Sequence, residues 1–339
     1  MVRKILRIIT FTTLILLGIL VVIAVTFLRL DIPIEELEDD YYTENSAYLE
    51  AEVSDLDGKP LNIKTHYQSY GNDDDPVIVL LHGAFSSSHT FMPWADRLQE
   101  AGYRVLLIDL PYHGLTGGFS DRITSLRRSA AVVKAVIDHL EIDSVAIGGN
   151  SMGGGVSWYF TSEYAEKDGF SVSHLVLIDA VHPEMSYEEG REGLPGIMRT
   201  RFVSGIVSQM TPKFLLEFLL NGAYGSERKP DEETVTRYYE LLRRSGNRQS
   251  ILRNTQEEQH GIDDTERLDT IREWGIPTLV LWGEEDTWVD QKYAYAFQES
   301  LDLAADNVLV YPGLGHVPME EAPERTFDDL IAFLENENQ

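Results

Sequence analysis

Residues 145–155 read VAIGGNSMGGG, and this stretch decides the fold. The apolar run 145–148 has the composition of a buried strand, and the residues after it are compatible with a helix. Between the two, Gly149-Asn150-Ser151-Met152-Gly153 has the spacing G-x-S-x-G, which is typical of a tight strand-to-helix turn carrying an exposed serine. Side chains two residues either side of Ser151 would collide in such a turn, which explains the two glycines. We therefore predict Ser151 as a nucleophile at a helix start, where backbone N–H groups face a reacting carbonyl.

Similar apolar runs recur along the chain and alternate with stretches of helical pattern, such as residues 125–140 and 322–334. The runs are residues 77–81, 105–110, 175–178, 278–281 and 308–310. Strands that are apolar on both faces suit a parallel sheet covered by helices on both sides. Residues 48–54 and 61–70 instead alternate polar and apolar, with Asp57-Gly58 between them, and this favours an antiparallel hairpin at the sheet edge.

Residues 185–266 interrupt this alternation, because they contain no strand signal and only helical patterning. Apolar residues recur there at helical spacing: Met198, Phe202, Ile206 and Met210, then Phe214, Leu215, Phe218 and Leu219. We interpret the segment as a helical cap inserted over the sheet. The stripes are expected to form the cap's own core, and lining of a substrate channel is the alternative.

The N-terminus has the pattern of a membrane anchor. Residues 8–28 carry no charge, and as a helix they would span about 30 Å, the thickness of the hydrocarbon layer. Arg3, Lys4 and Arg7 precede the run and acidic residues follow it, which predicts a cytoplasmic N-terminus and a catalytic domain outside the cytoplasm. The alternatives are a cleaved signal peptide, whose apolar run should be shorter and end in a cleavage site, and a buried core helix.

We therefore divide the chain into an anchor (residues 1–30), an acidic stalk (31–47), a core (48–184 and 267–339) and the cap (185–266). The 339 residues have a formal net charge of −28, which makes nucleic acid an unexpected partner. The absence of cysteine excludes disulfides, thiolate metal sites and a cysteine nucleophile. No cofactor or metal motif is apparent, and the sequence does not indicate an oligomeric state.

The motif around Ser151 and its strand–turn–helix setting resemble the α/β-hydrolase superfamily from about residue 48 to the C-terminus. The resemblance implies a mostly parallel eight-stranded sheet with a cap after its sixth strand. It also implies the chain order nucleophile, acid, histidine. Trp282-Gly283-Glu284-Glu285-Asp286 resembles the family's W-G-x-x-D, and Gly313-Leu314-Gly315-His316 resembles its histidine loop.

The resemblance makes Asp286 the acid and His316 the base. His316 would take the proton from Ser151 and return it to the leaving group, while Asp286 holds the ring and stabilises its cation. Other acids at strand ends remain alternatives for Asp286: Asp179, Glu285 and Asp290. Other histidines at strand ends are alternatives for His316: His82, His113 and His182.

Two backbone N–H groups should form the oxyanion hole. Met152, directly after the nucleophile, supplies one; the second comes from the stretch Leu81-His82-Gly83-Ala84-Phe85, with Phe85 preferred and Ala84 as the alternative. We expect His82 to hold this loop. Asp109-Leu110-Pro111-Tyr112-His113-Gly114 resembles the family's D-x-P-G-x-G turn but departs from it at Tyr112-His113. Asp109 is expected to organise the turn, and Tyr112 and His113 to contact substrate.

These residues predict a serine hydrolase that acts through an acyl-enzyme on a small or medium apolar carboxylic ester. Relatives with an aspartate nucleophile are excluded by Ser151. The alternatives are hydrolysis of a carbon–carbon bond in ring-fission diketones, acyl transfer, and a non-catalytic ligand receptor. Carbon–carbon hydrolases that this chain resembles usually carry an arginine and an aromatic residue near the pocket for the substrate carboxylates. The arginines available in the cap are Arg199, Arg201, Arg243 and Arg244. The anchor with residues 109–118 and 149–155 also resembles a group of membrane-anchored bacterial α/β hydrolases.

Overall fold

The computed structural model describes residues 2–55, 57–121, 123, 125–185, 208–248 and 264–336. Eight strands form a single sheet in the order β1-β2-β4-β3-β5-β6-β7-β8. Only the pairs β1–β2 and β2–β4 are antiparallel among the described strands, so the expected edge hairpin and mostly parallel sheet are confirmed. The strands are β1 (Ser46–Ser54), β2 (Pro60–Tyr70), β3 (Val77–Leu81), β4 (Arg104–Ile108), β5 (Ser144–Asn150), β6 (Ser171–Ile178), β7 (Thr278–Gly283) and β8 (Val308–Tyr311).

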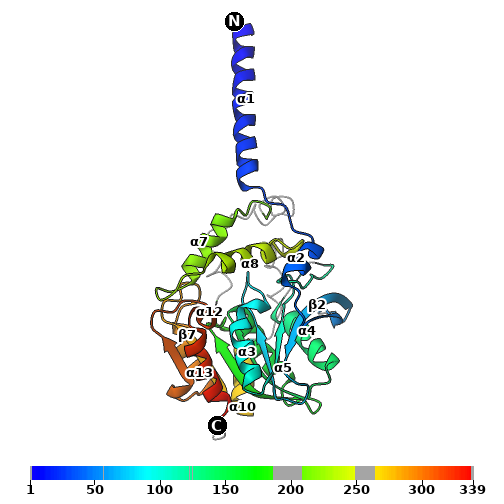
Figure 1. Ribbon diagram of the computed structural model, residues 1–339, viewed down its shortest axis with the longest axis vertical. Coiled ribbons are helices and arrows are strands. Elements are labelled where there is room, and N and C mark those ends of the chain that lie inside the picture. The colour runs from blue at the N-terminus through cyan, green and yellow to red at the C-terminus, as the bar shows by residue number, and fades with distance from the viewer. Residues whose placement is uncertain are drawn as a thin grey trace.

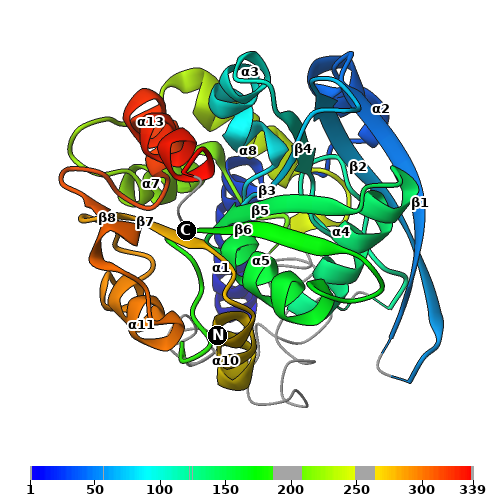
Figure 2. The same cartoon turned by 90° about the horizontal axis from the view of Figure 1, so that it is seen from below.

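Helices cover both faces of this sheet (Figures 1 and 2). Helices α4 (Leu126–His139), α5 (Met152–Tyr164), α10 (Asp264–Trp274) and α11 (Lys292–Leu301) pack on one face. Helices α3 (Met92–Glu100), α12 (Pro318–Glu321) and α13 (Pro323–Leu334) pack on the other. The short 3-10 helices η1 (Ser88–Phe91) and η4 (Ala305–Asn307) lie in loops.

The central strands are apolar throughout because both of their faces are buried. In β3, Val79 and Leu81 pack on the α4–α5 side, whereas Ile78 and Leu80 pack on the α3–α13 side. Alternate residues of a strand point to opposite faces, so a strand between two helical layers needs apolar residues at every position.

The described part of the cap consists of two helices, α7 (Lys213–Ala223) and α8 (Glu232–Leu242), which lie at the end of the molecule that carries α1 (Figure 1). They pack on each other through Leu216, Leu220, Val235 and Tyr239. Residues 186–207 and 249–263 lie outside the described residues. They include Met198, Phe202 and Ile206 of the predicted stripe and the candidate arginines Arg199 and Arg201.

The outer stripe of α7 corrects one expectation. Phe214, Leu215, Phe218 and Leu219 were expected in the core of the cap, but all four are exposed. Leu216 and Leu220 face α8 instead. Apolar side chains of α7 point in most directions around its axis, so helical spacing alone does not distinguish the buried face of the helix from the exposed one.

Helix α1 (Val2–Phe27) projects away from the domain (Figure 1). It is long and apolar enough to cross a membrane, and the apolar stretch that meets this criterion has none of its residues buried. The alternative of a buried core helix is therefore wrong. The hydroxyl of Thr10 donates to the Leu6 carbonyl at 3.0 Å and that of Thr13 to the Ile9 carbonyl at 2.9 Å. Both polar groups are thus satisfied inside the helix, as lipid surroundings require.

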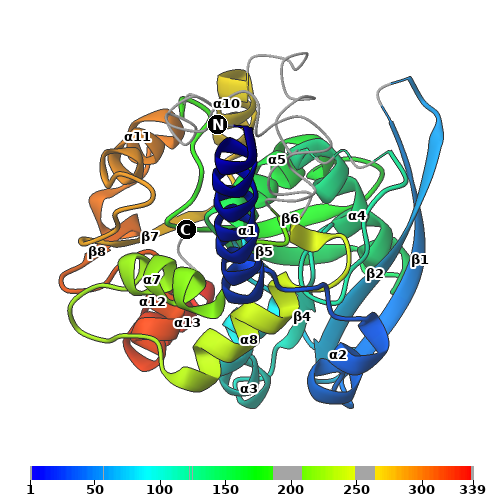
Figure 3. The same ribbon diagram turned by 90° about the horizontal axis from the view of Figure 1, so that it is seen from above.

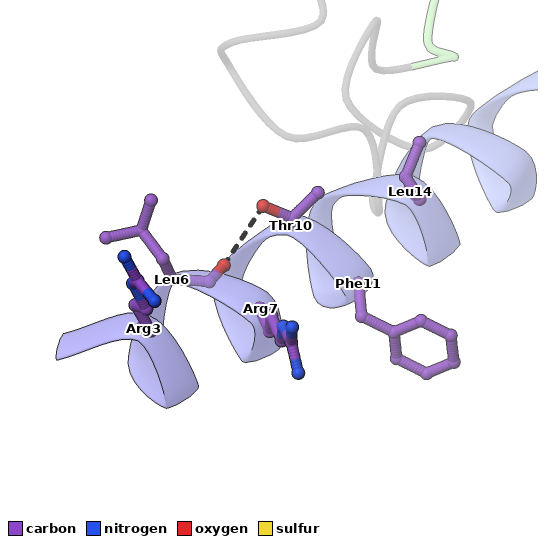
Figure 4. Close-up of a pocket in the computed structure, with 6 residues that line it drawn as sticks. All are labelled: Arg3, Leu6, Arg7, Thr10, Phe11 and Leu14. Atoms are coloured by element: carbon purple, nitrogen blue, oxygen red, sulfur yellow. Dashed lines mark hydrogen bonds between the residues drawn. The ribbon is translucent and has the colours of Figure 1, made fainter. Parts of the chain in front are cut away.

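Figure 4 shows a hollow along α1 with one of these hydroxyl bonds. Its lining side chains are Arg3, Leu6, Arg7, Thr10, Phe11 and Leu14. All of them belong to one isolated helix, which cannot enclose a ligand. This hollow is therefore not a candidate functional site.

Residues 31–47, predicted as an acidic stalk, pack against the domain. They contain α2 (Ile34–Tyr41) and the start of β1, and Leu37 is buried against Leu115 and Leu241. The hydroxyl of Tyr41 donates to the carboxylate of Glu240 in α8 at 2.7 Å. Four acids of α2 are exposed (Glu35, Glu36, Asp39 and Asp40), while Leu37 and Tyr41 hold the helix against the domain. The high charge of the helix does not prevent its docking. The other domain boundaries remain predictions.

Candidate active site

Ser151 lies between β5 and α5 in a backbone conformation that most residues avoid. Its φ is 54° and its ψ is −117°, and such strain persists only where surrounding contacts impose it. Its N–H donates to the Ile178 carbonyl at 2.9 Å, and its carbonyl accepts from the N–H groups of Gly155 and Val181, each at 3.1 Å. A Cβ on Gly153 would lie 2.1 Å from the Leu81 carbonyl oxygen, so the motif's second glycine is required by close packing.

Asp286 and His316 are held together at the ends of β7 and β8. Oδ2 of Asp286 lies 2.7 Å from Nδ1 of His316, while its Oδ1 accepts from the N–H groups of Trp288 at 2.7 Å and Val289 at 3.1 Å. One carboxylate oxygen is therefore fixed by backbone and the other faces the ring. A carboxylate only accepts hydrogen bonds, so Nδ1 carries the proton and Nε2 is left as the basic nitrogen.

Asn150 joins the histidine loop to the serine turn. Its Nδ2 donates to the carbonyl of His316 at 2.8 Å and to that of Ile178 at 3.2 Å. The residue directly before Ser151 is thus bonded to the backbone of His316. Sequence reasoning did not single out Asn150, because the variable position of G-x-S-x-G carries no signal for this role.

The loop after β3 lies against the serine turn. A Cβ on Gly83 would be 3.1 Å from the Cβ of Ser151. Phe85, two residues on, has a φ of 65°. Its ring centroid lies 6.2 Å from that of Trp288, which in turn lies 5.2 Å from that of His316. The loop proposed to donate to an oxyanion and the histidine loop are therefore connected by aromatic contacts, with Met152 at the first position of α5.

His82 and Asp109 hold the surrounding loops. Nδ1 of His82 bonds the Gly83 carbonyl at 2.7 Å, and its Nε2 accepts from the Leu110 N–H at 3.0 Å. Burial lowers the pKa of His82, so the ring stays neutral and serves as a tether. Asp109 accepts from the N–H groups of Ser88 at 2.7 Å and Leu115 at 2.8 Å, which makes it the organiser of its turn.

Tyr112 does not reach the candidate site, which corrects its predicted role. Its ring packs with Phe119 and Val132 under the β1–β2 hairpin, and its hydroxyl donates to the Phe119 carbonyl at 3.0 Å. His113 is buried with its ring centroid 5.2 Å from that of His82. Its contact with substrate remains a prediction.

The other candidate acids and base are engaged elsewhere. Glu285 accepts from the N–H and hydroxyl of Ser226, each at 2.7 Å, and Asp290 accepts from the Lys292 N–H at 2.8 Å at the start of α11. The ring of His182 lies against Tyr293 and Phe297, with centroids 5.6 Å and 4.4 Å away. Asp286 is therefore the candidate acid that hydrogen-bonds His316 among the described residues.

Asp179 is the alternative acid that does lie at the site. It is fully buried at the end of β6, and its Oδ1 accepts from the Gly283 N–H at 2.9 Å. Burial and the nearby Asp286 carboxylate raise its pKa well above the usual range. Asp179, Asp286 and His316 have the spacing of a metal-ligand set, but the Asp286–His316 hydrogen bond already uses the facing atoms of that pair.

Two buried glutamates of α12 hold the histidine loop and the cap, respectively, and sequence reasoning missed both. Glu321 accepts from the N–H groups of Gly315 at 2.9 Å and Gly225 at 2.7 Å. Glu320 accepts from the Tyr238 hydroxyl at 3.0 Å and Arg237 at 3.1 Å, both in α8 of the cap. In the sequence they are only two acids in a charged helix, so no pattern indicated their burial.

Comparison with known proteins places this geometry in a family. A family description of the alpha/beta hydrolase fold matches residues 76–323, which is more than half of the chain. The protein therefore belongs to the α/β-hydrolase family, and the expected fold is confirmed. Its residues 144–164, from β5 through Ser151 to α5, are the strand–turn–helix unit that first indicated this family.

Curated relatives have different reactions in their names. A 2-hydroxy-6-oxononadienedioate/2-hydroxy-6-oxononatrienedioate hydrolase of Paraburkholderia phymatum is 27% identical over 87% of this chain and 99% of its own. A non-heme chloroperoxidase of Burkholderia pyrrocinia is 28% identical over 81% of this chain and 97% of its own. The protein is similar to both across nearly their whole length.

Solved structures agree on the fold. The crystal structure of a membrane phospholipase A, described as a bacterial virulence factor, has a TM-score of 0.65 at 21% identity and covers 98% of each chain. A thermophilic esterase of Thermogutta terrifontis has a TM-score of 0.66 at 20% identity, over 85% of this chain and 98% of its own. The protein is a hydrolase-fold chain with esterase neighbours and one N-terminal helix able to span a membrane.

Proposed function

We propose that the protein is a membrane-anchored serine hydrolase that cleaves apolar carboxylic esters through an acyl-enzyme. The observation that carries the proposal is the 2.7 Å hydrogen bond between Asp286 and His316, whose carbonyl accepts from Asn150, the residue before the strained Ser151. A neutral serine is a weak nucleophile, and it needs a base with a free nitrogen that is oriented by an acid. His316 fits this requirement, because Asp286 binds its Nδ1 and its Nε2 remains available as the base.

In the proposed reaction, Oγ of Ser151 attacks the ester carbonyl carbon and its proton passes to Nε2 of His316. The N–H groups of Met152 and of Phe85 or Ala84 stabilise the resulting oxyanion. The carbon–oxygen bond to the leaving alcohol then breaks, and His316 returns the proton to that oxygen. Water, activated by His316, releases the acid in the second half of the reaction. Asp286 stabilises the imidazolium in both halves.

We also propose that α1 anchors the protein with its N-terminus in the cytoplasm and the hydrolase domain outside it. Support comes from Arg3, Lys4 and Arg7 before the apolar stretch and the acidic residues after it. The likeness to a membrane phospholipase A extends over 98% of the chain and places phospholipid esters among the substrates to be tested. Small or medium apolar carboxylic esters remain the primary expectation.

Hydrolysis of a carbon–carbon bond is the second candidate, and the P. phymatum relative favours it. Its substrate is a dicarboxylate, so a site for it should present arginines. Arg243 is occupied by the Leu30 carbonyl, to which Nη2 donates at 2.8 Å, and Nη1 of Arg244 donates to the Ser245 carbonyl at 3.2 Å. Neither contact directs these guanidinium groups to Ser151. Of the two candidate arginines that the structure describes, neither supports the carbon–carbon reaction, and ester hydrolysis stays our first proposal.

The experiment is an assay of full-length protein in detergent micelles with p-nitrophenyl esters of increasing acyl length. We expect Ser151→Ala to lose activity by about 10⁴-fold or more, because removal of the nucleophile eliminates the acyl-enzyme route. Ser173→Ala, which alters an exposed serine on β6, is the matched control and should keep full activity. A fluorophosphonate adduct on Ser151, located by peptide mass, would identify the nucleophile independently.

Each unexpected outcome of this assay would favour a different alternative function. Activity that survives Ser151→Ala would contradict the proposed nucleophile. No ester cleavage together with turnover of a ring-fission dienedioate would favour the second candidate. Faster product formation with an added alcohol, with a new ester as product, would identify acyl transfer. A folded protein that binds ligands but forms no fluorophosphonate adduct would favour a receptor.

A further inference from the structure

The outward face of cap helix α7 is apolar and exposed. Phe214, Leu215, Phe218 and Leu219 are 57%, 41%, 75% and 41% exposed, although Leu216 and other residues of the opposite face are buried against α8. A helix that is apolar on nearly all sides is normally buried on all sides. An uncovered patch of large apolar side chains therefore indicates a binding surface.

This surface lies at the base of α1. The rings of Phe27, the last residue of α1, and Phe214 meet edge to face, with centroids 6.1 Å apart and planes at 70°. Figures 1 and 3 show α7 and α8 at the end of the domain from which α1 emerges. If α1 spans a bilayer, the lipid surface begins where α1 ends, which is beside α7.

The segment that follows α1 is hydrogen-bonded to the cap, so it is not a flexible linker between α1 and the domain. The N–H of Arg29 donates to the Gln209 carbonyl at 2.7 Å, and the N–H of Ile32 donates to the Arg243 carbonyl at 2.8 Å. Asp31 forms an ion pair with the buried side chain of Arg248. These bonds fix the direction in which α1 leaves the domain, and they make the cap the face that is turned to the membrane.

We propose that the outer face of α7 (Phe214, Leu215, Phe218 and Leu219) lies in the interfacial lipid of the bilayer that α1 spans. Helices with an apolar face of this kind lie in the plane of the membrane, with that face at the boundary between headgroups and acyl chains. Leu28 and Leu30, which are 44% and 68% exposed, extend the surface between α1 and α7. The inference goes beyond ester hydrolysis but depends on the proposed anchoring by α1.

Docking of α7 would also set the position of the candidate active site. The helix ends at Ala223, whose carbonyl accepts from the N–H of His316 at 2.7 Å. Eleven residues of helix are about 16 Å long, so one end of α7 meets the anchor and the other end meets the histidine loop. A membrane-docked α7 holds His316 near the lipid surface, where apolar esters concentrate.

The test uses the absence of native cysteine, which allows one fluorophore to be attached at a chosen site of the full chain. Four single-cysteine variants are labelled with an environment-sensitive dye and placed in phosphatidylcholine nanodiscs, where both faces are accessible. Phe218→Cys and Leu219→Cys report on α7, and Leu17→Cys reports on α1. The control is Glu273→Cys, at an exposed position of α10, and α10 lies at the opposite end of the domain (Figure 1). Quenching by spin-labelled lipid is compared with quenching by aqueous iodide.

We expect lipid quenching and blue-shifted emission for the labels at 17, 218 and 219, and iodide quenching for the label at 273. The proposal is overturned if labels 218 and 219 respond like label 273 while label 17 is quenched by lipid. It is also overturned if they are shielded from both quenchers in nanodiscs that hold two copies of the protein, because a second copy then covers α7. If label 17 is not quenched by lipid, the anchoring itself fails, and the docking proposal fails with it.

Discussion

The carboxyl groups of Asp179 and Asp286 converge on His316: an oxygen of each acid and a ring nitrogen of the histidine all lie within 4.8 Å of one another. The two acids come from the ends of adjacent strands, β6 and β7. Asp286 bonds the ring directly, whereas Oδ2 of the buried Asp179 has no hydrogen-bond partner among the described residues. Two buried carboxylates at this distance would repel each other, so Asp179 carries the proton and Asp286 the charge.

This division predicts unequal effects of the two isosteric substitutions on activity. Asp286→Asn places an amide against His316 and removes the charge that stabilises its cation, so we expect kcat to fall by about 10²- to 10⁴-fold. Asp179→Asn replaces a neutral carboxyl group with a neutral amide and should change kcat by less than about threefold. The measurement is kcat and KM of both variants on the best ester.

The opposite ranking of the two variants would reverse the roles assigned to Asp179 and Asp286. If Asp179→Asn were the more damaging change and Asp286→Asn nearly neutral, Asp179 would be the acid and our reading of the hydrogen bond would be wrong. Glu285→Gln, next to Asp286 but bonded to Ser226, is the control for a local change of charge. It should retain full activity.

Asp179 should also make stability dependent on pH. Its pKa is raised in the folded state, so the native protein binds a proton that the unfolded chain releases above about pH 4. Stability therefore falls as pH rises above that value, by up to about 1.4 kcal/mol per pH unit until the folded pKa is reached. Asp179→Asn cannot ionise and avoids this loss. The variant should gain stability relative to wild type between about pH 4 and pH 7.

Denaturant unfolding of full-length protein in detergent at several pH values measures this difference. The exposed Asp74→Asn serves as control and should follow wild type across the range. A difference between Asp179→Asn and wild type that stays constant with pH would show that Asp179 has the same protonation in both states, contrary to this expectation.

Much of the fold could be predicted because buried parallel strands need apolar residues on both faces. The predicted strand 77–81 has the same bounds as β3, and every one of its residues is buried. The candidate site followed from position along the chain, because parallel strands place Ser151, Asp286 and His316 at the same edge of the sheet. The structure brings Asp286 and His316 to 2.7 Å, whereas the approach of Ser151 to His316 stays a prediction.

The parts that sequence reasoning missed depend on which face of a helix is covered. In α7, Leu215 and Leu216 are adjacent and chemically identical, yet only Leu216 is buried. In α2, Leu37 is buried although acids surround it in the sequence, and Tyr41 bonds Glu240 of the cap. Glu320 and Glu321 resemble surface acids, and only their tertiary partners, such as Tyr238 and Gly315, show that they are buried acceptors.

Glu321 provides a test of how the histidine loop is held. Its carboxylate accepts from the N–H groups of Gly315 and Gly225, and the change to Gln replaces one acceptor oxygen with a donor that faces them. We expect Glu321→Gln to lower stability by about 1–3 kcal/mol, because a buried N–H loses its partner. Displacement of His316 should lower kcat by about 10- to 100-fold.

Denaturant unfolding and kcat are the measurements for Glu321→Gln. The control is Glu324→Gln in α13, whose exposed carboxylate pairs with Arg97 at 2.8 Å. Such exposed pairs contribute little, so this variant should match wild type in stability and in rate. Equal behaviour of the two glutamine variants would contradict the role of Glu321 in holding the loop.

The serine turn offers a matched pair of glycine substitutions within one helix. A Cβ at Gly153 would lie 2.1 Å from the Leu81 carbonyl oxygen, which is backbone of a central strand and cannot move aside. A Cβ at Gly155 would lie 3.3 Å from Leu126 Cδ2, at the end of a flexible side chain, and 3.5 Å from Val181 Cβ, which is an ordinary contact distance. Gly153→Ala should therefore abolish activity and lower stability by more than about 3 kcal/mol, as overpacking against backbone does. Gly155→Ala should fold normally, helped by the higher helix propensity of alanine. Wild-type activity and unfolding midpoint in Gly153→Ala would contradict the described packing of the turn.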